Sequence, residues 1–304
     1  MLSIRRIIVC LELSRFHVSA GNSIFPGLSP AFANSALVAA IRGIPLAVAG
    51  ILPSVSSPTS ENACLPDFPD SPMPPSGGCF RSMIERQAAA VGVAISQYEE
   101  FTTEEWCRIL ASEMCHADVM LAFDLHQNPQ APSTPEENSW LHALKDFGGI
   151  LWLHHSSHYP AIAPANQITD VIAPVTSDAT AMEIIFAAVN TAKSLQARLW
   201  LVPGKFRDAD PGERTPDALT IYSHLANCDY RTLPFGVRVT EPSNDFEDTI
   251  RRQLEDCPVP VLLQQRNPAD NSCVPAITHP LFRAPQCSVL LLPAERFSSP
   301  QQQN

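Results

Sequence analysis

Several polar side chains stand directly after apolar runs that are typical of buried strands. Asp124 and His126 follow one run, His154 and His155 close another, and Asp178 follows a third. The carboxyl ends of the strands in a parallel α/β sheet form the edge at which such proteins bind their ligands. A histidine beside a carboxylate can serve as a general base. The pattern therefore nominates Asp124, His154, His155 and Asp178 as catalytic residues.

The same histidines have a second interpretation, a metal site. Neutral imidazoles are common ligands of zinc and other transition metals. His155 and His158 would face one divalent ion if the turn between them is helical, with His126 as a further ligand. The HHxxH pattern matches no established metal motif, so a third interpretation stays open, in which these residues are hydrogen-bonded or solvated strand ends. Only the metal interpretation requires a cofactor.

Helix-start signals place these strand ends in an α/β framework. Ser29 before Pro30, with Gly43 as a stop, predicts a helix over 30–42. Thr102 and Glu105 form a capping box. Two further boxes start at Thr134 and Thr180, and other helices are predicted over 81–97, from 215 to about 227, and around the stripe of Phe246, Ile250 and Leu254.

The strands between these helices are almost continuously apolar. Such runs are typical of strands buried on both faces by helices. We count about seven, including IPLAVAGIL, GILWLHH and PVPVLLQQ, a strand near 231–239, and CSVLLLP as a final edge strand. The predicted fold is a three-layer α/β sandwich with a mostly parallel, doubly wound sheet.

We expect one α/β domain over residues 1–298, interrupted by a Pro/Ser-rich excursion at 53–78. This stretch holds seven prolines, which neither a helix nor a central strand accommodates. Residues 299–304 read as a disordered tail, and the sequence shows no repeat of fixed period.

Composition narrows the classes of function. The formal net charge is −11, and the chain has only three lysines, so it lacks the basic patch that binding to nucleic acid requires. Nine dispersed cysteines without a CxxC pair are typical of reduced thiols, which favours a cytoplasmic protein. No apolar run approaches the roughly 18 residues of a membrane span.

Residues 146–259 carry four segments in an informative order: FGGILWLHH, ITDVIAPVTSDATAMEII, ARLWLVPGKF and LPFGVRVTEPSNDF. Their order and spacing resemble the second half of the ParA/MinD-like P-loop ATPases. In that family a carboxylate ends the strand that is here closed by His154 or His155. The resemblance implies the same α/β fold and a homodimer.

The chain departs from that family at the phosphate-binding loop. Such a loop needs glycines, a lysine for the phosphates and a Ser/Thr hydroxyl for Mg²⁺. The segment that follows IIVCLEL, SRFHVSAGNSIFPGLSP, contains no lysine. We therefore expect a catalytically inactive relative that acts as a binding or scaffolding subunit with a protein partner. Two alternatives remain: a hydrolase or transferase that uses the His/Asp strand ends, and an active nucleotide switch with an unrecognised phosphate loop.

Overall fold

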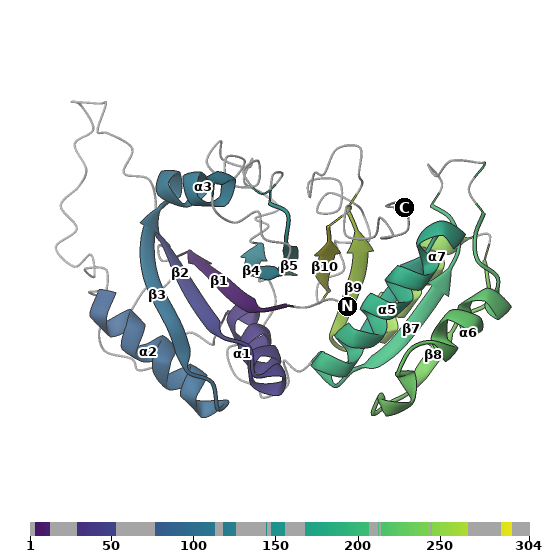
Figure 1. The fold of residues 1–304 in the computed structure, drawn as a ribbon, viewed down its shortest axis with the longest axis horizontal. Helices are drawn as coiled ribbons and strands as arrows, with labels where there is room; N and C mark the ends of the chain where they lie inside the picture. The colour runs from purple at the N-terminus through teal and green to yellow at the C-terminus, as the bar shows by residue number, and fades with distance from the viewer. Residues whose placement is uncertain are drawn as a thin grey trace, which may run out of the picture.

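A single sheet of ten strands organises the chain (Figure 1). The computed structural model describes residues 4–12, 29–52, 77–112, 118–125, 144, 147–155, 168–206, 212, 214–243, 245–266 and 287–293. The strand order is β3-β2-β1-β4-β5-β10-β9-β6-β7-β8. Eight of the nine pairings are parallel, and only β5 with β10 is antiparallel.

The elements fall into two halves along the chain. The first half holds β1 (Arg6–Glu12), α1 (Pro30–Arg42), β2 (Leu46–Leu52), α2 (Gly77–Ala90), β3 (Ile95–Thr102), α3 (Thr103–Ser112), β4 (Val119–Leu125) and β5 (Ile150–His155). The second half holds β6 (Asp170–Val175), α5 (Asp178–Leu195), β7 (Arg198–Pro203), α6 (Ala218–Ala226), β8 (Val237–Val239), α7 (Phe246–Asp256), β9 (Pro260–Gln265) and β10 (Ser288–Leu292).

The two halves repeat one topology. Read outward from the centre, the order is β5-β4-β1-β2-β3 on one side and β10-β9-β6-β7-β8 on the other. Helices α1, α2 and α3 follow the strands of the first half as α5, α6 and α7 follow those of the second. The antiparallel β5–β10 pair joins the halves, as expected for two units related by an approximate two-fold axis. No repeat is visible in the sequence because the topology recurs without a recurring sequence period.

Helices cover both faces of the sheet, which confirms the predicted doubly wound α/β sandwich and gives a Rossmann-like fold. One core cluster packs α1, α2, α5 and α6 against the first face. The other packs α3 and α7 against the second face. In Figure 1, α1 and α5 lie on the same side of the sheet, near the junction of the two halves.

The strand count of about seven was wrong, because ten strands are present. The helix predicted over 81–97 ends at Ala90. Gly92, two residues later, takes a φ of 80°, and β3 follows. β3 is a partly exposed edge strand, so it lacks the apolar run used to recognise the others. The strand predicted near 231–239 shrinks to β8, after a 3₁₀ turn at Tyr230–Thr232.

β10 was also misplaced by the sequence analysis. It lies between β5 and β9 at the centre of the sheet rather than at an edge. All five of its residues are buried, which fits a central strand. The apolar run of this strand was recognised in the sequence. Its central position was not, because that position depends on an antiparallel pairing with β5, whereas a series of parallel strands was expected.

The helix caps show which start signals the chain uses. Ser29 Oγ accepts a hydrogen bond from Phe32 N, and Gly43 takes the left-handed conformation after α1, as predicted. Thr102 and Glu105 bond each other as a capping box: Glu105 N donates to Thr102 Oγ1 and Thr102 N to Glu105 Oε2. The box at Thr180 was wrong, since the cap of α5 is Ser177, three residues earlier, and the helix starts at Asp178.

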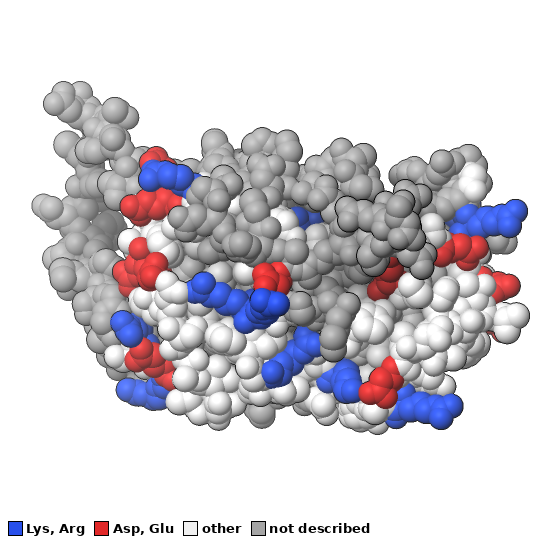
Figure 2. Space-filling view, viewed as in Figure 1, with Lys and Arg blue, Asp and Glu red and all other residues white. Residues whose placement is uncertain are grey.

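Other predictions lie partly or wholly outside the described residues. They concern the loop 13–28, most of the Pro/Ser-rich stretch 53–78, the helix from Thr134 and the tail 299–304. Among the described helices, none is long and apolar enough to cross a membrane. On the face shown in Figure 2, described basic and acidic side chains are interspersed.

Candidate functional site

The first half has a topological switch point at the carboxyl ends of β1 and β4. From β1 the chain continues to β2 on one side, whereas β4 lies on the other side. Ligands of open α/β sheets bind in the crevice at such a point, where the N-terminus of a helix faces them. Here that helix is α1.

The first amides of α1 are already bonded within the chain. Ala31 N donates to Asp124 Oδ1 at 3.1 Å, and Phe32 N donates to Ser29 Oγ at 3.2 Å. These N–H groups have no partner inside the helix and carry the positive end of its dipole. The Asp124 carboxylate therefore occupies the place that a bound anion would take.

His154 is the lateral neighbour of Asp124. The two residues are register partners in the parallel β4–β5 pair, so their side chains leave the same face of the sheet. The His154 side chain is 0% exposed, and its ring centroid lies 4.7 Å from that of Trp152. It is a residue of the core and does not line an open crevice.

The His154 ring is held neutral. Burial lowers its pKa to about 3. Nδ1 lies 3.5 Å from Asn34 Nδ2, which can only donate, so this contact favours the tautomer with its proton on Nε2. In the described part of the chain, His154 Nε2 is one of the buried atoms without a hydrogen-bond partner. Another is Oγ of Ser35, the residue that follows Asn34 in α1.

Asp178 does not join this group. It is the first residue of α5, in the second half, and is exposed. In the sheet, β10 and β9 separate β5 from β6, the strand that leads to Asp178. Because β5 and β10 are antiparallel, the strands of the second half end along the edge at which the first half's strands begin. The predicted catalytic set thus divides between two halves of the sheet.

The predicted metal ligands fall largely outside the described part of the chain. His126 and His158 lie outside it, and for His155 only the backbone, in β5, is described. Within the described residues, no group of three His, Cys, Asp or Glu side chains could hold a metal ion. The metal-site prediction therefore stays a prediction.

The second half repeats the closed helix start. At the N-terminus of α5, Ala179 N donates to Ser177 Oγ at 3.2 Å, and Asp178 N donates to Arg214 O at 2.9 Å. Both groups lie at the end of β6, the counterpart of β1. The two helix starts that face a switch point have their leading amides bonded within the chain.

Asp124 and His154 were singled out from the sequence, whereas Asn34, whose Nδ2 contacts His154 Nδ1, was missed. Asn34 lies inside a helix that was expected to supply only packing, and it is 3% exposed. A polar residue on the buried face of α1 was the available signal, since buried amides require partners.

Comparisons with known proteins identify no family. No family model matches the sequence. No curated protein matches it either. Two solved structures from Pseudomonas aeruginosa are similar over most of their length, each with 11% identity and a TM-score of 0.48. One is a functionally unknown protein from strain PAO1, covering 96% of this chain and 93% of its own. The other is a proposed universal stress protein from strain UCBPP-PA14, covering 96% and 94%. Nothing about function is carried over from them.

Proposed function

We propose that this chain is a non-hydrolysing α/β protein that acts as a binding or scaffolding subunit, as an inactive relative of the ParA/MinD-like ATPases would. The observation that carries the proposal is the Asp124 carboxylate on Ala31 N. A phosphate at this helix start would have to displace a negative charge already bonded there, and the two anions would repel each other.

The electrostatics of the site point the same way. Phosphoryl transfer depends on cations that stabilise the charge developing on the phosphate oxygens. The described residues bonded around the start of α1 are Ser29, Asn34, Asp124 and His154. None of these carries a positive charge at neutral pH, since burial keeps the pKa of His154 far below its usual value.

A hydrolase or transferase built on the His/Asp strand ends has weaker support. Asp124 and His154 are neighbours, but the His154 ring is wholly buried and Asp124 Oδ1 is engaged by α1. A general base must reach the proton that it removes. The binding function is therefore the one that we propose.

Association is the test of a binding subunit. The full chain, isolated from its native cells at physiological salt with a terminal tag, is expected to run in native mass spectrometry as a complex with another protein at fixed stoichiometry. Its preparations are expected to release no phosphate from ATP. A chain that remains without a protein partner and hydrolyses ATP or a model ester at a rate abolished by Asp124→Asn would overturn the proposal.

A further inference from the structure

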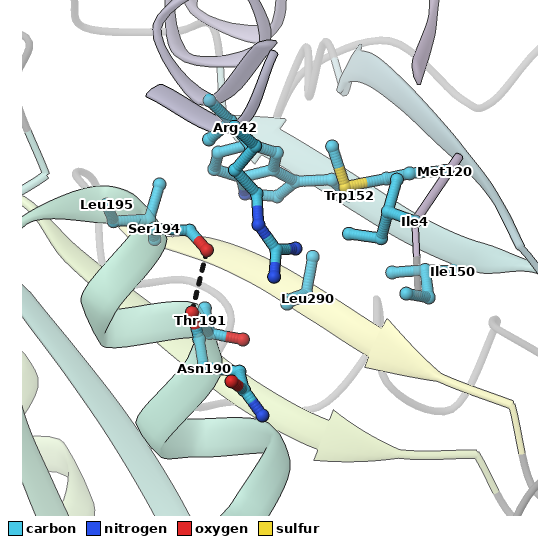
Figure 3. Close-up of a pocket in the computed structure, with 11 residues that line it drawn as sticks. Ile4, Arg42, Met120, Ile150, Trp152, Asn190, Thr191, Ser194, Leu195 and Leu290 are labelled. Atoms are coloured by element: carbon cyan, nitrogen blue, oxygen red, sulfur yellow. Dashed lines mark hydrogen bonds between the residues drawn. The ribbon is translucent and has the colours of Figure 1, made fainter. Parts of the chain in front are cut away.

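The seam between the two halves holds a small cavity, between the last turns of α1 and α5 (Figure 3). Its volume is about 30 Å³, which is room for about one or two water molecules. On the α5 side, Ser194 Oγ donates to Asn190 O at 2.7 Å, the dashed line in Figure 3. The cavity therefore has no room for a ligand larger than water.

The surface of the second half is more informative, because it carries the most exposed large apolar side chains of the described residues. Four of them are 53% to 78% exposed: Met182, Leu219, Tyr222 and Phe235. No other large apolar side chain in the described ranges is more than 43% exposed. Two of the four stand on α6, one on α5, which packs against α6, and one in the turn before β8. Apolar side chains that gather in one exposed region mark an interaction surface.

The exposed face of α6 is an uncharged stripe. Its exposed residues recur at the three- and four-residue spacing of one helix face: Ala218, Leu219, Tyr222, Ser223 and Ala226. The opposite face packs into the core through Ile221 and Leu225. α6 therefore has apolar side chains beyond those that hold it in the fold.

The fold itself does not require an apolar outer face on this helix. α2 is the counterpart of α6 in the repeated topology. Its exposed residues include Arg81, Glu85 and Arg86, and Arg81 Nε donates to Glu85 Oε1 at 2.8 Å. Two helices in equivalent places thus differ, one with a charged, solvated face and the other with an apolar one. This difference favours contact with another molecule at α6.

Charged side chains stand at the two ends of α6. It is the outermost helix of the second half in Figure 1, and the surface over it is mostly white in Figure 2. Asp217 precedes the helix and Arg231 follows it, and both are exposed. Neither has an ion-pair partner among the described residues, whereas Asp229 is paired with Lys193 at 2.9 Å. One end of the stripe is therefore acidic and the other basic.

We infer that two copies of this chain associate through this face, with α6 packed antiparallel against α6 of the second copy. A two-fold contact brings the same patch of both copies together. With a net charge of −11, two copies repel each other over most of their surface, so the contact needs an uncharged patch such as the α6 stripe.

The antiparallel arrangement also matches the charges. It brings the Asp217 end of each helix to the Arg231 end of the other, so that opposite charges meet at both ends of the contact. Leu219 and Tyr222 pack across the two-fold axis, and the small Ser223 and Ala226 let the two helices approach closely. The inference goes beyond the proposed function, which concerns a different protein as partner.

Sedimentation equilibrium of the full chain tests the contact. We expect a monomer–dimer equilibrium with a Kd on the order of 10 µM, because one helix face and its neighbours make an interface at the small end of the specific range. Leu219→Glu places a carboxylate in the apolar contact of both copies and should weaken the dimer about tenfold or more. The matched control Ile41→Glu places the same charge at an exposed aliphatic position of α1 and should dimerise as the parent does.

A pair of charge variants tests the antiparallel orientation. Arg231→Glu brings two acidic groups together at each end of the contact, and Asp217→Arg brings two basic groups together. Each variant alone should dimerise more weakly than the parent. In an equimolar mixture the two variants pair opposite charges at both ends, so the mixed dimer should be tighter than either variant alone.

The inference is overturned by a chain that stays monomeric up to about 100 µM, by a dimer that Leu219→Glu leaves unchanged, or by one that Ile41→Glu weakens equally. A mixed dimer no tighter than those of the separate variants contradicts the antiparallel arrangement. A monomeric chain that still forms a complex with another protein overturns this inference and leaves the proposed function standing. Loss of that complex in Leu219→Glu would assign the face to the other protein.

Discussion

Arg266→Ala is expected to lower the free energy of unfolding by about 3–5 kcal/mol. Arg266 follows β9 and is 3% exposed. Its Nη1 donates to Phe147 O at 2.5 Å and its Nη2 to Gly149 O at 2.7 Å, so one side chain of the second half holds the segment that enters β5 of the first. The alanine variant leaves two buried carbonyls without these charged donors. Urea denaturation of both proteins measures the difference.

Two further variants identify the cause of that loss. Arg266→Lys keeps the charge but not the fork of two donors, and should recover less than half of the lost stability. Arg86→Ala removes an exposed arginine of α2 and should change stability by no more than about 0.5 kcal/mol. A loss in Arg266→Ala as small as that of Arg86→Ala would show that the two carbonyls do not depend on the guanidinium.

His154 is expected to make the protein sensitive to acid. Burial lowers its pKa to about 3 in the folded chain, whereas an unfolded histidine titrates near 6.5. Between these values the unfolded state binds a proton that the folded state excludes. The part of the folding stability that depends on a neutral His154 is therefore fully present above about pH 6.5 and is lost as the pH falls toward 3. Between pH 7.5 and 4.5 the parent should lose about 2–3 kcal/mol more than His154→Leu does.

Urea denaturation at both pH values measures this difference. Val9→Ala provides the control, because it destabilises the core at a wholly buried position and keeps His154. It should show the pH dependence of the parent. If His154→Leu and the parent lose the same stability between the two pH values, the histidine is not a buried neutral group.

Local sequence signals predicted the helices well where the cap residues are unambiguous. Ser29 with Gly43 bounds α1, and Thr102 with Glu105 caps α3, because these side chains satisfy backbone groups within four residues of their own position. The stripe of Phe246, Ile250 and Leu254 is buried in α7 as predicted. Such signals need no knowledge of distant parts of the chain.

The global arrangement needed information that such signals do not carry. An apolar run such as Ser288–Leu292 predicts a buried strand, but its register and direction depend on a partner more than 130 residues away. The antiparallel β5–β10 pair decides that Asp178 belongs to a different half from Asp124 and His154. The sequence could nominate these residues as strand ends, but it could not decide which ends meet.

The burial of His154 was likewise beyond the sequence. A histidine at a strand end is either open to solvent or covered, and here the cover comes from α1, whose residue Asn34 lies 120 positions earlier. The same helix directs Ala31 N onto Asp124. The group of residues was predictable, whereas its closure by α1 required the fold.

The central claim is that the start of α1 is closed to phosphate, and direct titration of the full chain with Mg·ATP tests it. The account predicts no saturable binding up to about 1 mM nucleotide, because Asp124 and Ser29 already hold the leading amides of α1. Saturable binding of one Mg·ATP per chain, with a Kd below about 0.1 mM, would contradict it.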